Sequence, residues 1–213
     1  MRMVIPCGPE FRVFPPMPST RTAELRGERA RLSSADWEAA ALDLLAEQGV
    51  AAVAVEPLAR RLGVTKGSFY WHFPSREALL KAALERWERL DETTVFAPLE
   101  EIADARARLR ELFVSTSREM RSHRLYSELL KALDHPVVQP VMARVSQRRI
   151  HFLMQAYRAL NFSRRDAMDR ARLVYSAYVG YLQLMLQLKL TRMSAEEFDA
   201  YVLHVVETFI PRE

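Results

Sequence analysis

The chain is poor in cysteine and glycine, and it contains no long uninterrupted apolar run. Its only cysteine among 213 residues is Cys7, which excludes an intrachain disulfide and makes a reducing cytoplasm the expected location. The longest apolar stretch, residues 173–190, contains Gln183, Gln187 and Lys189, so it is expected to be a buried helix and not a membrane span. The N-terminus shows no apolar segment of signal-peptide length, and no secretion signal is expected.

Patterns typical of catalysis or metal binding are also missing. We find no glycine-rich phosphate loop, no Gly-x-Ser-x-Gly elbow and no Cys–His nucleophile arrangement. The histidines are not spaced as ligands of a shared metal ion, and each is expected to be a surface or packing residue: His72, His123, His135, His151 and His204. The sequence therefore predicts no catalytic residue, no metal site and no cofactor.

What the sequence does contain is helical periodicity. Hydrophobic residues make up 49% of the chain and recur at helical spacing, while no alternating β pattern competes with them. The predicted fold class is all-α. The net charge of +4 is compatible with a polyanionic partner but does not establish one.

Two short helical patterns separated by a glycine organise the N-terminal part. Leu58 and Leu62 lie on one face of the first pattern, and Gly63 can take the left-handed backbone that ends a helix. Thr65 is positioned as the N-cap of the second helix, with Val64 and Phe69 spaced as a hydrophobic staple. A helix, a short turn with glycine and a second helix form a helix-turn-helix pattern.

The second of these helices carries side chains suited to phosphate oxygens and base edges. Lys66 and Ser68 are expected near base edges, and Tyr70 near a base or a phosphate. The remaining residues are expected to position the protein on the DNA backbone. The predicted DNA-binding set is Thr65, Lys66, Gly67, Ser68, Tyr70, Trp71, His72 and Arg76.

The segment from Leu58 to Leu80, LARRLGVTKGSFYWHFPSREALL, resembles the DNA-binding region of the TetR/AcrR family of bacterial transcription regulators. The similarity extends from about Leu32 to Trp87, roughly a quarter of the chain. Val55 occupies a position where these regulators often have a Ser or Thr cap, and Arg76 one where lysine is common. The resemblance implies a larger C-terminal domain that binds a small molecule and forms a dimer.

Breaks in the helical pattern divide the chain into four parts. Ser33 and Asp36 have capping-box spacing at the start of the first helix, and Pro98 is the expected boundary of the C-terminal domain. The predicted parts are a flexible, basic, Pro-rich arm at 1–31, a helix-turn-helix DNA-binding domain at 32–74, a connecting helix at 75–97, and a helical effector-binding and dimerisation domain at 98–213. Residues 1–20 either contact DNA or form a disordered extension.

The last two predicted helices, at 164–190 and 195–210, are expected to form the dimer interface. Apolar residues occupy nearly the whole circumference of the first, which a monomer could not easily bury. Two such helices from each chain would make a four-helix bundle. The alternative is that this surface packs against its own chain. The predicted interface residues are Ser176, Val179, Gly180, Gln183, Val202 and Val206.

A ligand cavity among the C-terminal helices is implied by the resemblance. Methionine adapts to irregular shapes, and tyrosine offers a polar group on an apolar wall. The candidate lining is Met120, Tyr126, Met142, Phe152, Met154, Tyr157, Tyr175 and Tyr178. An apolar or aromatic effector is expected.

Taken with the resemblance, the sequence predicts a repressor that binds a palindromic double-stranded DNA operator as a homodimer and is released by its effector. One alternative is a DNA-binding protein without an effector, either a constitutive repressor or an architectural factor. A helical-bundle enzyme is the second, and it would need a catalytic arrangement that is not recognisable in the sequence.

Overall fold

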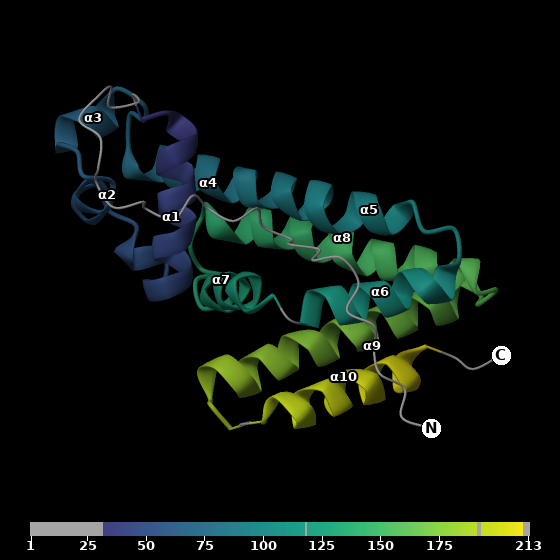
Figure 1. Cartoon of the computed structure of the whole chain (residues 1–213). Coiled ribbons are helices and arrows are strands. Elements are labelled where there is room, and N and C mark those ends of the chain that lie inside the picture. Colours follow the sequence, from purple (N-terminus) through teal and green to yellow (C-terminus); the bar gives the residue numbers. More distant parts are fainter. Residues whose placement is uncertain (1–31, 118, 191–192, 211–213) are drawn as a thin grey trace, which may run out of the picture.

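The computed structural model describes residues 32–117, 119–190 and 193–210, and within these residues it is helical without strands (Figure 1). The all-α prediction is thereby confirmed. The predicted arm, 1–31, lies outside the described residues. In chain order the elements are α1 (Ser34–Gln48), the 3₁₀ turn η1 (Val50–Ala52), α2 (Val55–Leu62), α3 (Lys66–Tyr70), α4 (Arg76–Asp91), the π-helix η2 (Glu92–Phe96), α5 (Ala97–Glu100), α6 (Ala105–Ser117), α7 (Met120–Leu130), α8 (Val138–Ala159), α9 (Arg164–Leu182), the π-helix η3 (Gln183–Gln187) and α10 (Ala195–Phe209).

The ends of the N-terminal helices follow from local chemistry. The predicted capping box is present, since the Ser33 N–H donates to Asp36 Oδ2 at 2.7 Å. Gly63 ends α2 with a φ of 66°, in the left-handed region that favours glycine. One expectation is corrected: Val55 is the first residue of α2, and the cap is Ala54, which offers no side-chain hydrogen bond.

Helix α4 begins at a serine N-cap, and the helical conformation continues beyond the expected end of this segment. Ser75 Oγ accepts from the Ala78 N–H at 3.1 Å. After Asp91 the chain stays helical through η2 and α5, so the prediction of a break at Pro98 is wrong. Pro98 lies in the first turn of α5, where a missing N–H is tolerated. The chain leaves the helical conformation only at residues 101–104.

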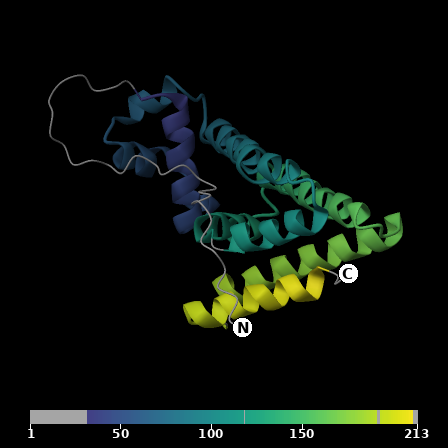
Figure 2. The same cartoon turned by 45° about the vertical axis from the view of Figure 1, so that its right-hand side comes forward.

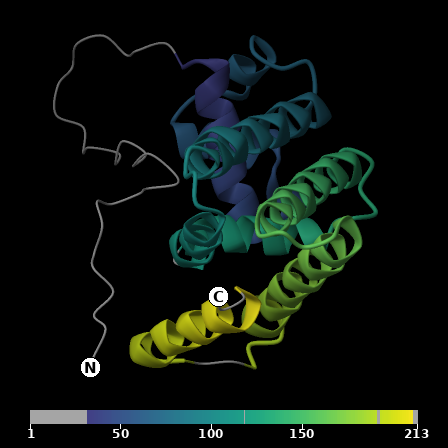
Figure 3. The same ribbon diagram turned by 90° about the vertical axis from the view of Figure 1, so that its right-hand side faces the viewer.

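The helices after α5 form a bundle. Helix α8 packs against α4, α6 and α9, and α10 packs against α6 (Figure 1). After a 45° turn, α1–α3 and the pair α9–α10 still lie on opposite sides of the molecule (Figure 2). The view turned by 90° shows α9 and α10 diverging from their connection, with α10 at the end of the molecule opposite α1–α3 (Figure 3). Within the described part, no helix is both long enough and apolar enough to cross a membrane.

The apolar core does not divide at the predicted domain boundary. Trp37, Phe69 and Trp87 belong to the same buried cluster as Leu125 and Leu129 of α7. Helix α1 packs against both α4 and α7. We call α1–α3 the headpiece, and this shared core fixes it to the rest of the chain.

Candidate DNA-binding surface and ligand cavity

One face of α3 is buried and the other is exposed. Phe69 is fully buried, with its ring 5.4 Å from that of Trp37 in an edge-on arrangement. Tyr70 and Trp71 lie on the opposite side, and Trp71 is 90% exposed. Thr65, Lys66 and Gly67 are also exposed, while Ser68 and His72 are partly buried. The structure therefore brings most of the predicted DNA-binding set to one exposed surface.

Lys66 and Arg76 already have partners within the chain. Lys66 Nζ forms an ion pair with Glu56 of α2, so a DNA phosphate or base would compete with that carboxylate. Arg76 differs more from the prediction. Its Nε and Nη2 donate to the carbonyl oxygens of Val53 and Val50, at 2.5 and 2.7 Å. These two nitrogens tie η1 to the start of α4, while Nη1 lies 3.5 Å from Glu77 Oε1.

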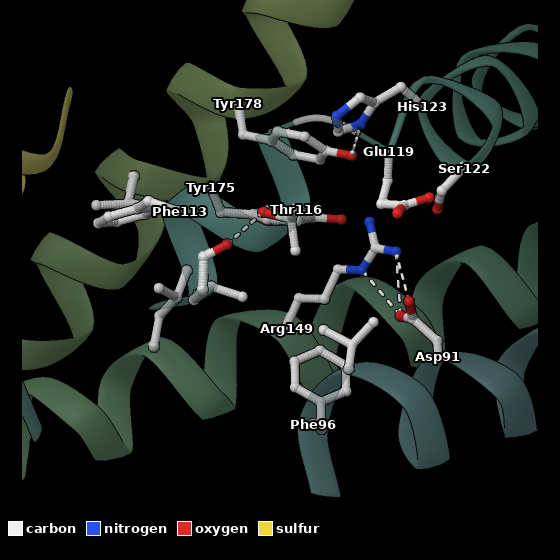
Figure 4. A pocket seen from close by; sticks show the side chains of 14 residues that line it. Asp91, Phe96, Phe113, Thr116, Glu119, Ser122, His123, Arg149, Tyr175 and Tyr178 are labelled. Atoms are coloured by element: carbon white, nitrogen blue, oxygen red, sulfur yellow. Dashed lines mark hydrogen bonds and ion pairs between the residues drawn. The ribbon is translucent and has the colours of Figure 1, made fainter. Parts of the chain in front are cut away.

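A cavity of about 110 Å³ lies among α4, α6, α7, α8 and α9 (Figure 4). Its apolar walls include Phe96, Phe113 and Val174. Its polar lining consists of Asp91, Thr116, Glu119, Ser122, His123, Arg149, Tyr175 and Tyr178. We call this space the first lobe.

An ion pair between Arg149 and Asp91 forms one wall of the first lobe. Arg149 Nη2 and Nε contact Asp91 Oδ2 at 3.0 and 3.2 Å, and the two side chains are only 13% and 9% exposed. Burial is the largest single influence and would lower the pKa of Arg149, but Asp91, Tyr178, Tyr175 and Tyr126 together raise that pKa, so the guanidinium keeps its charge. The guanidinium also lies 4.7 Å from the centre of the Tyr126 ring.

Hydroxyl groups and one imidazole line the neighbouring wall. His123 Nδ1 lies 3.1 Å from Tyr178 Oη, and Tyr175 Oη donates to Ser146 Oγ at 2.9 Å and also contacts Tyr126 Oη. Burial lowers the pKa of His123 and raises that of Tyr178 to about 12. At neutral pH both side chains are therefore uncharged. Among the described residues, no three His, Cys, Asp or Glu side chains gather as a metal site.

A second cavity, also of about 110 Å³, lies between α6, α9 and α10. We call it the second lobe. It is lined mainly by aromatic and aliphatic side chains, including a stacked pair, Tyr181 and Tyr201, with ring centres 5.0 Å apart. The two lobes share Phe113, Thr116, His123, Val174 and Tyr178.

Two of the eight predicted pocket residues, Tyr175 and Tyr178, line the first lobe. The other six line neither lobe, and most of them lie in apolar clusters. Tyr126 lies behind Tyr175, Met142 belongs to the core shared with the headpiece, Phe152 packs on Phe96, Met154 and Tyr157 belong to a cluster around Leu109, and Met120 is exposed at the start of α7.

The polar residues of the first lobe were missed by the sequence analysis. His123, expected at the surface or in ordinary packing, is buried beside the cavity. A signal for Arg149 was present in the sequence. Val145, Phe152 and Ala156 are buried at helical spacing on α8, and Arg149 occupies the position between Val145 and Phe152 on the same face.

The predicted dimer residues are only partly on the surface. Ser176 is exposed, and a Cβ added to Gly180 would meet nothing within 4 Å, while Val179 and Gln183 are partly buried. Val202 and Val206 are buried against their own chain, because this face of α10 packs on the bundle and Val202 closes the second lobe. These two valines are therefore covered by their own chain. The predicted set leaves out exposed leucines that extend the α9 surface, namely Leu173, Leu184 and Leu188.

Helices α1–α3 have the arrangement of a helix-turn-helix DNA-binding domain, with α2 and α3 joined through Gly63 and α1 packed behind them. Residues 39–83 match the family model for bacterial regulatory proteins of the tetR family. This N-terminal region is thus of the tetR type, as the sequence pattern indicated.

The curated relatives match only this N-terminal region or a slightly longer segment. The class A tetracycline repressor of transposon 1721 from Escherichia coli is 52% identical over 46 residues, 22% of this chain and 21% of the repressor. The regulator EthR of Mycobacterium tuberculosis H37Rv is 41% identical over 66 residues, 29% of this chain and 31% of EthR. The chain thus matches between a fifth and a third of each of these proteins.

Solved structures match over most of the chain. A TetR regulator from Legionella pneumophila has a TM-score of 0.71 at 17% identity, covering 86% of this chain and 100% of that one. A regulator from Saccharomonospora viridis, solved in complex with choline, has a TM-score of 0.70 at 22% identity, covering 81% and 92%. At these identities the likeness shows the shared fold. The matched proteins are regulators of transcription, a family that is not enzymatic.

Proposed function

We propose that this protein is a ligand-responsive transcriptional regulator, a repressor that binds a palindromic operator as a homodimer and is released by a small-molecule effector. One observation carries the proposal: α4 joins both sites. Its first residue, Arg76, holds the headpiece turn, and its last, Asp91, lines the first lobe. Such a regulator acts in the bacterial cytoplasm, on chromosomal or plasmid DNA.

The exposed face of α3 would enter the major groove. In this arrangement Lys66 and Ser68 contact base edges, while Thr65, Tyr70, Trp71 and His72 contact bases or phosphates. Gly67 leaves room for close approach, because a Cβ there would meet only Thr65 Oγ1, at 3.7 Å. Arg76 would contact a phosphate through Nη1, because Val53 and Val50 occupy its Nε and Nη2.

The homodimer would form through the exposed side of α9. Leu173, Ala177, Gly180 and Leu184 follow one another at helical spacing, and each is exposed or has open space beside it. Contact between two such surfaces would bury the leucines, and Gly180 would allow the helices to approach closely. Helix α10 would contribute its outer face, at residues such as Ala200 and His204, in place of Val202 and Val206.

The cavities favour an effector over a constitutive repressor, which would be expected to have a filled C-terminal core. Occupation of the cavity would stabilise a dimer state whose two headpieces no longer match successive major grooves. Only a difference in effector affinity between the two states can produce such a switch.

Selection of bound sequences from random duplex DNA tests the DNA-binding proposal. We expect a palindrome with half-sites about one helical turn apart, bound by two chains. Light scattering at micromolar concentration tests the dimer. The variant Gly180→Phe should shift the native dimer toward monomer, whereas a phenylalanine introduced at an exposed position away from this surface, Ala51→Phe, should leave it unchanged. A native monomer, or an unrelated set of selected sequences, would contradict the proposal.

A further inference from the structure

The two lobes adjoin each other across shared lining residues. They share five lining residues, and three of these, Phe113, Val174 and Tyr178, present apolar surface to both sides. Each lobe has a volume of about 110 Å³. An apolar cavity of roughly 150 Å³ can hold benzene, so each lobe approaches the size of one ring after modest side-chain movement. A ligand that fills both lobes must therefore be elongated.

The second lobe accepts only the apolar part of such a ligand. Among the described residues that line it, none is Asp, Glu, Lys or Arg. Its ionisable side chains are His123, which burial keeps uncharged at neutral pH, and tyrosines. Phe198, Tyr201 and Phe209 supply aromatic faces from α10. An aromatic or aliphatic body fits this environment, whereas a charged group would lose its hydration without gaining a partner.

The first lobe offers hydrogen bonds at its far end. Asp91 engages Nε and Nη2 of Arg149, and Nη1 points toward Tyr178 in Figure 4. Arg149 lines the cavity and has the Tyr178 hydroxyl within reach, while the imidazole of His123 is already engaged by Tyr178 and by the backbone of Ser117 and Thr116. A carbonyl, ether or hydroxyl oxygen of a ligand is the group that can accept from the guanidinium.

The charges around Arg149 disfavour an ionised head group. Asp91 pairs with the guanidinium, and Glu119, at the start of α7, points toward it as well (Figure 4). A ligand carboxylate would be a third negative group around one buried positive charge. Seen from Phe113 in Figure 4, both carboxylates lie behind the guanidinium of Arg149. A cationic group that entered from the second lobe would therefore meet this positive charge before it reached either carboxylate.

We propose that the two lobes together bind an elongated, uncharged aromatic molecule, with an oxygen acceptor against Arg149 and an apolar ring between α9 and α10. This inference rests on the proposed function of the cavity as the effector site. It goes beyond that function by naming the charge, the length and the orientation of the ligand.

Three probes of nearly equal shape test the charge directly: biphenyl-4-carboxamide, biphenyl-4-carboxylate and biphenyl-4-carboxamidine, the last a cation at neutral pH. Titration calorimetry with the full-length, DNA-free protein should show the carboxamide binding at least about tenfold more tightly than either charged probe. Benzamide, which can fill only one lobe, should bind at least about tenfold more weakly than biphenyl-4-carboxamide. A preference for a charged probe, equal affinities, or no binding of the carboxamide would overturn the proposal.

The variant Asp91→Asn tests the reason for this selectivity. It removes one carboxylate while retaining a side chain that can accept from Arg149, so the carboxylate probe should gain at least about tenfold in affinity and the carboxamide should change little. The matched control is Asp134→Asn, which makes the same change at an exposed position in the turn between α7 and α8. An unchanged preference in a folded Asp91→Asn protein would contradict the charge argument. If that variant does not fold, the comparison of probes on the native protein still decides the proposal.

A separate measurement distinguishes this inference from the proposed function. Release of the selected operator by biphenyl-4-carboxamide can be followed by fluorescence anisotropy. Selective calorimetric binding without operator release would support the ligand class and contradict the switch. Operator binding by a protein that binds none of the probes would leave the regulator proposal intact and overturn the ligand class.

Discussion

The headpiece and the C-terminal bundle differ in where their functional polar side chains lie: on the surface in the headpiece, and in the interior in the bundle. In the headpiece, Phe69 and Trp37 are buried, and the hydroxyl, aromatic and basic groups of α3 face outward. In the bundle, Arg149 and Asp91 lie inside, next to cavities, and leucines of α9 face outward. A polar group exposed on a short helix can meet a large polyanion, while an enclosed polar group selects a small molecule. The difference also predicts which substitutions should affect stability and which should affect binding.

The largest expected effect is on the enclosed charge. Arg149→Met leaves Asp91 buried without its partner and should lower the free energy of unfolding by about 3–5 kcal/mol. The control Arg144→Met, on the same helix, removes a bidentate pair with Glu88 whose side chains are 50% and 32% exposed, and should cost at most about 1 kcal/mol. Urea unfolding at pH 7 measures both. Equal losses of unfolding free energy would mean that the buried and the exposed ion pair are equivalent, and would contradict the contrast between the interior and the surface.

The next effect is on the exposed face of α3. Trp71→Ala should leave the unfolding free energy within about 0.5 kcal/mol, because the side chain makes little contact with the protein. It should weaken binding to all DNA sequences by about tenfold, as expected for one lost hydrogen bond to a charged group. Lys66→Ala should instead reduce the discrimination between operator variants. Anisotropy titrations on a set of single-base variants would show whether the two substitutions differ in this way, and identical profiles would reject the assignment of base and backbone contacts.

A smaller effect is expected at the turn between α2 and α3. A Cβ at Gly63 would meet nothing within 4 Å, so only its backbone φ of 66° disfavours other residues. Gly63→Ala should therefore destabilise the protein by about 1–2 kcal/mol. Gly63→Asn should cost less, because asparagine tolerates the left-handed region. Thermal unfolding of the two variants provides the comparison, and an alanine variant as stable as the native protein would show that α2 can end in another way.

The smallest effect is a pH dependence in the bundle. Burial lowers the pKa of His123 below its ordinary 6.5, so below that pH the unfolded chain binds a proton that the folded chain does not. Stability should consequently fall as the pH decreases, by at most about 1 kcal/mol between pH 6.5 and 5.5. Replacing His123 by Gln should remove this part of the slope, while His204→Gln, at an exposed position, should retain it. Urea midpoints at the two pH values measure this slope. A slope that is unchanged in His123→Gln would contradict the assignment.

Sequence reasoning succeeded where a feature depends on residues close together in the chain. The capping box at Ser33, the helix stop at Gly63 and the outward position of Trp71 each follow from spacing within a few residues. The cavity could not be predicted in this way, because Asp91 and Arg149 come from helices 58 residues apart in sequence. Tyrosine and methionine were chosen for their general chemistry, and most of them proved to fill the core. The face on which a side chain of a long helix lies depends on packing that the sequence does not specify locally.

In the proposed switch, α4 would act as a lever. Its 16 residues place Arg76 and Asp91 at opposite ends, about 22 Å apart at a rise of 1.5 Å per residue. A rotation of about 5° at the cavity end would displace the headpiece end by about 2 Å over such a length. In a symmetric dimer the displacements would add to about 4 Å, on a separation of roughly 34 Å between successive major grooves. A movement at the cavity no larger than a side-chain adjustment could therefore bring two recognition helices out of phase with the DNA.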